Sequence, residues 1–268
     1  MKIGKKEFDV KNHTYVMGIL NVTPDSFSDG GKWNQKDRAL SHVESMIKQG
    51  MDILDIGGES TRLGYTLLSE EEEIERVLPV IRAVKENFDI PISLDTYKPA
   101  VAQAGILEGA DLINDIWGLK YDDKMARVIA DGSVACCLMH NRKEAVYDAF
   151  LTDVLLDLKE TVELAEKAGI DMTRVILDPG VGFAKSYEQN LQIMNHMEML
   201  RQLGYPVLLG CSRKSVIGLT LDLPCGEREE GTIATTVLAV MKGCAFVRVH
   251  DVEKNVRAVR MTEAILKS

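Results

Sequence analysis

The amino-acid sequence predicts an α/β protein built as a single (β/α)8 barrel, and three observations carry that prediction. Eight short, continuously apolar runs alternate with longer segments whose apolar residues recur every three or four positions. The length of 268 residues suits one such barrel, and no linker or low-complexity segment divides the chain. Polar residues gather directly after the apolar runs. We therefore expect one domain over residues 1–268, with its active site at the C-terminal ends of the strands.

The expected strands read as buried on both faces, because they are almost entirely apolar and rich in β-branched residues. They cover residues 15–20, 53–56, 92–94, 112–113, 134–139, 175–177, 207–209 and 246–249. Eight strands of this kind, separated by helices, favour a closed parallel barrel over an open sheet.

Two of the intervening segments carry a clear helical period of apolar residues. Their repeating positions are Ile74, Val77, Leu78, Ile81 and Val84 in one, and Val154, Leu155, Leu158, Val162 and Leu164 in the other. Ser69 and Glu72 form an S-x-x-E capping box, so the first of these helices is expected to begin directly after Ser69.

Composition and charge exclude several classes of protein. The net charge of −9 argues against non-specific binding to nucleic acid or to anionic membranes. Residues 1–10 carry no apolar signal-peptide segment, and no stretch approaches the roughly 18 apolar residues of a membrane span. The five cysteines are odd in number and lack zinc-site spacing. A cytoplasmic protein with free thiols and no nucleic-acid or membrane partner is expected.

The residues that follow the expected strands carry the chemistry. They are Asn21, Asp55, Asp95, Asn114, Asp115, His140, Asn141, Asp178, Ser212, Arg213, Lys214, Ser215, Arg248 and His250. Because the C-terminal ends of barrel strands converge on one face, these side chains are expected to share a site. Asp95, Asn114 and Asp178 offer acceptors to a heterocycle. The cationic residues, which also include Arg62, suit a phosphate-like group.

Long motifs along the chain resemble those of the dihydropteroate synthase family, in the family's order. They are MGILNVTPDSFSDGG (17–31), DIGGESTR (55–62), SLDTYK (93–98), INDIWG (113–118), LDPGVGFAK (177–185), GCSRKS (210–215) and VRVHD (247–251). The resemblance spans residues 15–255. It implies a transferase of folate biosynthesis that joins 6-hydroxymethyl-7,8-dihydropterin pyrophosphate to p-aminobenzoate and releases pyrophosphate. It also implies assistance by Mg²⁺ and a homodimer.

The resemblance also implies roles for the site residues. The pterin ring would contact Asp95, Asn114, Ile116, Met139, Asp178, Phe183 and Lys214. The pyrophosphate would contact Asn21, Thr61, Arg62, Arg248 and His250, with Asn21 as the magnesium ligand. The p-aminobenzoate would contact Phe27, Thr61, Arg62, Lys214 and Ser215. Asp95, Lys214, Arg248 and His250 would be catalytic.

A dissociative substitution is expected, in which the C–O bond breaks before the amine attacks. Arg248 and His250 would stabilise the departing pyrophosphate, and Asp95 would stabilise the developing positive charge. The resemblance also implies that the loops 23–33 and 58–68 close over the site, which would exclude water.

One position departs from the family pattern, because Leu63 stands where the family usually has proline after S-T-R. Losing proline raises the entropy cost of ordering the loop by about 1 kcal/mol. We therefore expect Leu63 to alter the binding of p-aminobenzoate or of sulfonamides.

Other functions remain open on the sequence. A folate-binding methyltransferase shares the pterin-binding barrel but lacks the S-R-K-S segment, and a pterin-binding paralogue would bind without turnover. Lys214 would also suit a Schiff-base aldolase. The segment 180–185 partly resembles a dinucleotide-binding loop, but it lacks the third glycine.

Overall fold

The computed structural model describes residues 1–22, 32–59 and 67–268, and within them eight parallel strands form a ring. The strands are β3 (Tyr15–Asn21), β4 (Ile53–Gly57), β5 (Ile92–Asp95), β6 (Leu112–Asp115), β7 (Ala135–Met139), β8 (Val175–Asp178), β9 (Leu208–Leu209) and β10 (Phe246–Val249). Their order is β8-β7-β6-β5-β4-β3-β10-β9. A parallel bridge between Leu177 and Val207 joins the two end strands. The predicted (β/α)8 barrel is confirmed.

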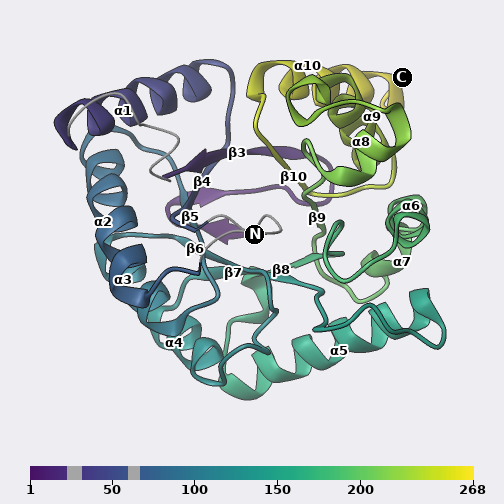
Figure 1. Ribbon diagram of the computed structural model, residues 1–268, viewed down its shortest axis with the longest axis horizontal. Helices are drawn as coiled ribbons and strands as arrows, with labels where there is room; N and C mark the ends of the chain where they lie inside the picture. The colour runs from purple at the N-terminus through teal and green to yellow at the C-terminus, as the bar shows by residue number, and fades with distance from the viewer. Residues whose placement is uncertain (23–31, 60–66) are drawn as a thin grey trace.

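The helices surround the strands as an outer ring, with the chain's N-terminus at the centre of the view (Figure 1). They are α1 (Lys32–Lys48), α2 (Glu70–Asn87), α3 (Pro99–Glu108), α4 (Lys124–Gly132), α5 (Phe150–Ala168), α6 (Tyr187–Asn195), α7 (Glu198–Arg201), α8 (Ser215–Leu221), α9 (Glu229–Met241) and α10 (Val252–Leu266), with short 3-10 turns at Met172–Arg174 and Cys225–Glu227. None of these helices is both long and apolar enough to cross a membrane, within the part of the chain that the structure describes.

The strand boundaries agree with the sequence prediction to within two residues, and those of β10 match it. Several strands continue onto a polar or glycine residue that ends the apolar run, as at Asn21, Asp95 and Asp178. Backbone pairing does not require an apolar side chain, so the ladder extends to the residue that faces the barrel mouth. Asp95, for example, lies opposite Asn114 in the β5–β6 ladder.

The predicted capping box at the start of α2 is confirmed. Ser69 Oγ accepts a hydrogen bond from the Glu72 backbone N–H at 3.2 Å, and Glu72 Oε2 accepts from the Ser69 N–H at 2.9 Å. Val77, Ile81 and Val84 on the predicted face are buried against the strands. The cap fixes the start of the helix, and the spacing of its apolar residues decides which side meets the barrel.

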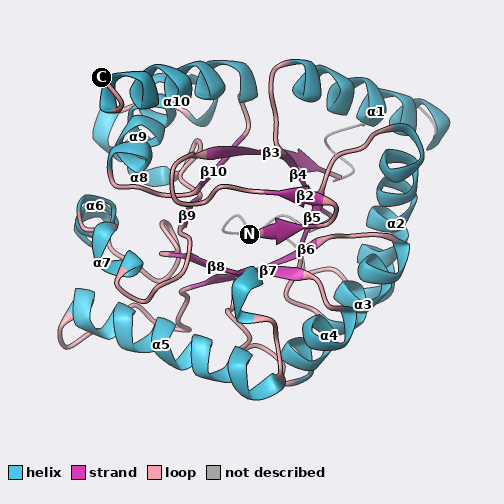
Figure 2. Ribbon diagram, turned by 180° about the vertical axis from the view of Figure 1, so that it is seen from behind, coloured by secondary structure: helices cyan, strands magenta, loops and turns pink. Residues whose placement is uncertain are grey.

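A small antiparallel hairpin, β1 (Lys2–Ile3) with β2 (Lys6–Glu7), precedes the barrel and was not expected from the sequence. Ile3 and Phe8 pack with residues at the N-terminal ends of the strands, among them Met17, Ile53 and Phe246. Figure 2 shows the hairpin across the centre of the ring of helices. It closes the end of the barrel away from the predicted site.

Candidate active site at the mouth of the barrel

A row of predicted site residues crosses four neighbouring strands at the barrel mouth. Asn21 of β3 lies opposite Gly57 of β4, Gly57 lies opposite Asp95 of β5, and Asp95 lies opposite Asn114 of β6. A Cβ at Gly57 would lie 3.6 Å from the Asp95 Cβ and 3.8 Å from Asn21 Oδ1. The glycine therefore leaves space between these two polar side chains.

Arg248 of β10 reaches across the barrel to two carboxylates. Its Nε donates to Asp55 Oδ2 at 2.7 Å, and its Nη2 donates to Asp95 Oδ2 at 2.6 Å. Asp55 is fully buried, and its other oxygen accepts from Ser93 Oγ at 2.6 Å. The sequence prediction placed Asp55 near the mouth but gave it no role. Its signal was a lone carboxylate inside an otherwise apolar strand.

Burial raises the pKa of Asp95 to about 7, because it disfavours the charged carboxylate; Arg248 opposes this shift and Asp55 adds to it. Burial acts to lower the pKa of Arg248, but the charges of Asp55 and Asp95 outweigh it and hold that pKa above its usual value. A cation thus lies between two carboxylates at the mouth, and the pKa of Asp95 is raised by its burial there.

Buried Asp178 and half-buried Lys214 carry opposite charges that act on each other on the other side of the mouth. Asp178 Oδ1 accepts from the Gly180 backbone N–H at 2.7 Å. Burial raises the pKa of Asp178, while Lys214 and that N–H oppose the rise. Burial lowers the pKa of Lys214, and Asp178 opposes the fall. Lys214 Nζ also donates to the Val181 carbonyl and lies 4.5 Å from the centre of the Phe183 ring.

The predicted apolar walls do gather into a cluster of their own. Ile116 and Met139 are buried together with Tyr97, and Phe183 and Trp117 pack against them. This cluster is separate from the two larger barrel cores. Tyr97 was not among the predicted site residues, because on the sequence it lies three positions after the end of the expected strand 92–94.

The residues after β9 and β10 are held to one another. Ser212 Oγ lies 2.9 Å from His250 Nδ1 and also accepts from the His250 backbone N–H at 3.2 Å. Arg213, expected from the sequence to contribute to anion binding, pairs with Asp251 at 2.6 Å. Ser215 is exposed and begins α8, directly after Lys214.

Phe27, Thr61 and Arg62 lie outside the residues that the structure describes, as does Leu63. In the described ranges, no three His, Cys, Asp or Glu side chains gather as a metal cluster. Asn21, which the sequence analysis expects to be the magnesium ligand, lies half-buried at the end of β3.

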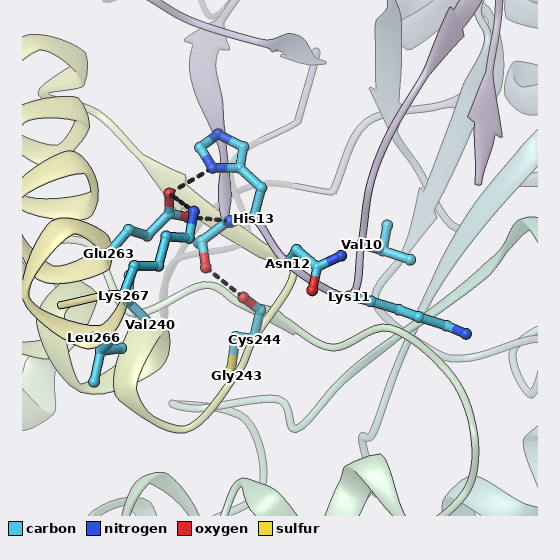
Figure 3. Close-up of a pocket in the computed structure, with 11 residues that line it drawn as sticks. Val10, Lys11, Asn12, His13, Val240, Gly243, Cys244, Glu263, Leu266 and Lys267 are labelled. Carbon is cyan, nitrogen blue, oxygen red and sulfur yellow. Dashed lines mark hydrogen bonds and ion pairs between the residues drawn. The ribbon is translucent and has the colours of Figure 1, made fainter.

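A small cavity at the opposite end of the barrel is shown in Figure 3. Its polar groups are engaged with one another: Glu263 accepts from the Thr14 N–H at 2.7 Å and pairs with His13 Nδ1 at 2.7 Å, and Thr14 Oγ1 donates to the Cys244 carbonyl at 2.7 Å. These contacts fasten the last helix to the start of β3, so this cavity is distinct from the site at the mouth.

Similarity to known proteins extends over nearly the whole chain. Residues 17–250 match the family model described as pterin binding enzyme. The chain is 59% identical to a dihydropteroate synthase of Clostridium beijerinckii over 100% of both chains, and 55% identical to that of Bacillus subtilis over 96% of this chain and 90% of the relative.

Solved structures agree with the sequence relatives. A dihydropteroate synthase from Clostridium difficile, determined in the presence of pteroic acid, superposes with a TM-score of 0.95 at 48% identity and covers 98% of this chain and 100% of that one. A Xanthomonas albilineans dihydropteroate synthase with 4-aminobenzoic acid has a TM-score of 0.91 at 42% identity, with 96% and 94% of the two chains covered.

Proposed function

The chain belongs to the pterin binding enzyme family, and we propose that separate groups of residues at its barrel mouth bind the pterin, the pyrophosphate and p-aminobenzoate during dihydropteroate synthesis. The activity is that of a transferase: 6-hydroxymethyl-7,8-dihydropterin pyrophosphate and p-aminobenzoate combine to give 7,8-dihydropteroate and pyrophosphate. One observation supports the assignment of residues most. Arg248 and Lys214 each act electrostatically on both Asp95 and Asp178, so two cations and two carboxylates share one buried space.

The pterin ring is assigned to the Asp178 side of that space. A buried carboxylate can accept a pair of adjacent N–H donors from the pterin edge. Asn114, 5% exposed, and Asp95 lie side by side in the β5–β6 ladder and offer the remaining ring contacts. Ile116, Met139 and Phe183 supply apolar surface for the flat ring. Lys214 donates to the pterin carbonyl.

The pyrophosphate is assigned to the β10 side, at Arg248 and His250, with Thr61 and Arg62 as further contacts. The His250 ring is oriented by Ser212, 2.9 Å from its Nδ1. Barrel enzymes commonly bind phosphate with the loops after strands seven and eight, which here lead to Ser212 and His250. Positive charge at this position stabilises the leaving group as the C–O bond breaks.

Asp95 is assigned to the reacting carbon's side of the pterin. As pyrophosphate leaves, positive charge develops on the pterin nitrogens, and a nearby carboxylate stabilises it. Arg248 holds Asp95 in place at 2.6 Å and keeps part of its charge balanced before the substrate arrives. No side chain needs to act as a nucleophile, and burial keeps the pKa of the Cys211 thiol raised to about 11.

The chemistry of Asn21 fits a magnesium ion. Its amide oxygen is a hard ligand, half-buried at the mouth, 3.8 Å from where a Gly57 Cβ would lie and on the same row as Asp95. Mg²⁺ is commonly held by one or two protein oxygens together with substrate phosphates and water. When bound, it would neutralise charge on the departing pyrophosphate.

The p-aminobenzoate is assigned to the start of α8, where Ser215 is exposed beside Lys214. The proposal also includes Phe27, Thr61 and Arg62, which the sequence analysis expects to contact p-aminobenzoate. The amine would then approach the pterin carbon from the Lys214 side, since that residue also faces Asp178 and the Phe183 ring.

The proposal also includes a homodimer in the cytoplasm. All five cysteines are free thiols, which fits a reducing compartment. The packed helices α9 and α10 expose Met241, Met261 and Ile265, each about 60% exposed, and so offer apolar surface to a second copy. Light scattering at micromolar concentration tests the oligomeric state.

The assay that tests the proposal measures pyrophosphate release and dihydropteroate formation, with and without p-aminobenzoate and Mg²⁺. Product that depends on p-aminobenzoate is the expected result. Tight pterin binding without product would contradict the proposal and favour a binding paralogue or a folate-binding methyltransferase.

A further inference from the structure

The segment between β8 and α6 is an unusual turn whose backbone has to be held by outside contacts. Gly180 and Gly182 have φ of 70° and 85°, and Ala184 takes a φ of 43° although it is not glycine. A Cβ at Gly180 would lie 2.0 Å from the His140 carbonyl oxygen. Left-handed backbone at a non-glycine residue persists only when surrounding contacts over-determine it.

This turn supplies two parts of the proposed pterin site. The Gly180 N–H donates to Asp178 Oδ1 at 2.7 Å and so orients the carboxylate. The Phe183 ring lies 4.5 Å from Lys214 Nζ and packs with the Ile116–Met139 cluster. A change in the turn would therefore move both the carboxylate and the apolar wall on the pterin side.

Lys185 contacts three acceptors that fix this turn. Its Nζ lies 2.9 Å from His140 Nδ1, 3.0 Å from the Gly180 carbonyl and 3.1 Å from the Phe183 carbonyl. These contacts match the three donors of an ammonium. Burial lowers the pKa of Lys185 to about 7, and the charges of Asp178 and Asp157 oppose this by favouring the ammonium form. The two carbonyls belong to the residues that present the N–H to Asp178 and the ring to Lys214.

A contact of the other ring nitrogen of His140 leaves its Nδ1 free to accept a hydrogen bond from Lys185. Its Nε2 lies 2.9 Å from Asp157 Oδ2 on α5, and that oxygen also accepts from Arg142 Nε at 2.6 Å. With Nε2–H donating to Asp157, Nδ1 is left to accept from Lys185. Burial lowers the pKa of His140 to about 3, so the ring stays neutral near pH 7. The chain Asp157–His140–Lys185 thus links α5 to the turn.

We propose that Lys185 is a positioning residue for the pterin ring, acting through the Gly180 N–H on Asp178 and through the Phe183 ring. The inference rests on the proposed function, because it concerns the pterin half of the same site. The hydrogen bonds of Lys185 among the described residues go to His140 and to the turn itself, so its effect should fall on the pterin.

The test compares Lys185→Met, which removes the donors and keeps the length, with the matched control Lys143→Met, an exposed lysine of the preceding loop. Calorimetry measures the Kd for the pterin pyrophosphate without p-aminobenzoate, and steady-state kinetics measure the KM for each substrate. Losing a charged donor network should raise the pterin Kd and KM about tenfold, with the p-aminobenzoate KM within about twofold. Lys143→Met should change neither.

Three results would overturn the inference. They are an unchanged pterin Kd in folded Lys185→Met, an equal rise in both KM values, or a failure to fold of both this variant and Lys185→Gln, which would leave only a structural role. Wild-type protein that binds the pterin but forms no dihydropteroate would instead refute the proposed function. The Kd comparison would still decide the role of Lys185.

Discussion

Arg248 and Asp95 pair across the mouth of the barrel at 2.6 Å, although 153 residues separate them in the chain and two other strands lie between theirs in the ring. The pair brings the proposed pyrophosphate-binding cation next to the carboxylate proposed to stabilise the pterin cation. Asp55 shares the same guanidinium at 2.7 Å, so Arg248 is held whether or not Asp95 carries its charge.

Replacing Asp95 with asparagine should lower kcat by about 100-fold, because a preorganised charge at the reacting centre is removed. The barrel should remain folded, since Asp55 still pairs with Arg248. Steady-state kinetics on Asp95→Asn, with the exposed Asp123→Asn as control, measure the effect. A kcat within threefold of wild type would refute a catalytic role for Asp95.

The pH dependence of kcat/KM for the pterin substrate should show a limb that belongs to Asp95. Burial raises its pKa to about 7 against the opposing charge of Arg248, and Asp55, Glu73 and Lys214 also act on it. The charged carboxylate is the active form, so kcat/KM should rise with pH through about 7 and then level. Asp95→Asn should lose this limb, and a limb that persists would assign it to another group.

The raised pKa of Asp95 should also make the stability of the protein depend on pH. The folded carboxyl keeps its proton up to about pH 7, whereas the unfolded one releases it near its ordinary pKa of about 4. Between these values the folded state binds more protons, so the Asp95 contribution to stability falls as pH rises. Urea unfolding of wild type should therefore show a decline over this range that is smaller in Asp95→Asn.

Lys98 should be essential for stability, because it lies buried between two carboxylates. Its Nζ donates to Glu73 Oε2 at 2.8 Å and to Glu59 Oε2 at 2.5 Å. Lys98→Met would leave both charges buried without their partner, at a cost of about 3–5 kcal/mol. Urea unfolding should show this loss, and Lys48→Met, which breaks an exposed pair with Glu44, should show far less. Equal effects would contradict the prediction.

Phe8 should contribute to stability without contributing to catalysis. It is 2% exposed and packs edge-on against Tyr15 at 4.7 Å between ring centres, at the end of the barrel away from the site. Phe8→Ala should cost about 3–5 kcal/mol in unfolding free energy. Val146→Ala, at a 66% exposed position, is the control. A loss of kcat in folded Phe8→Ala would show that the two ends of the barrel are coupled.

Leu63→Pro should change the binding of p-aminobenzoate or of sulfonamides while leaving the pterin Kd unchanged. Proline restricts φ and lowers the entropy lost when the loop orders, by about 1 kcal/mol, which corresponds to roughly fivefold in affinity. Inhibition constants for a sulfonamide and the KM for p-aminobenzoate measure it. Unchanged values for both ligands would refute the expectation from the sequence.

Local patterns predicted most of the fold and which polar residues lie at the mouth of the barrel. Each strand was found within about two residues, because a continuously apolar run marks a strand buried on both faces wherever it lies in the chain. The N-terminal hairpin was missed, since β1 and β2 are two residues each and too short to show a period. The hairpin is anchored by Ile3 and Phe8, which pack against residues at the N-terminal ends of the strands.

By itself, the sequence determined the barrel, the capping box at Ser69 and the convergence of Asn21, Asp95, Asn114, Asp178, Lys214 and Arg248 on one mouth. Only the tertiary structure decided which side chains contact one another. Arg248 pairs with Asp55 and Asp95, Arg213 pairs with Asp251, and Lys185 contacts His140. The reason is physical. Which end of a strand a residue occupies is a local property, whereas its partner across the mouth depends on strand stagger and barrel closure, which join residues far apart in the chain.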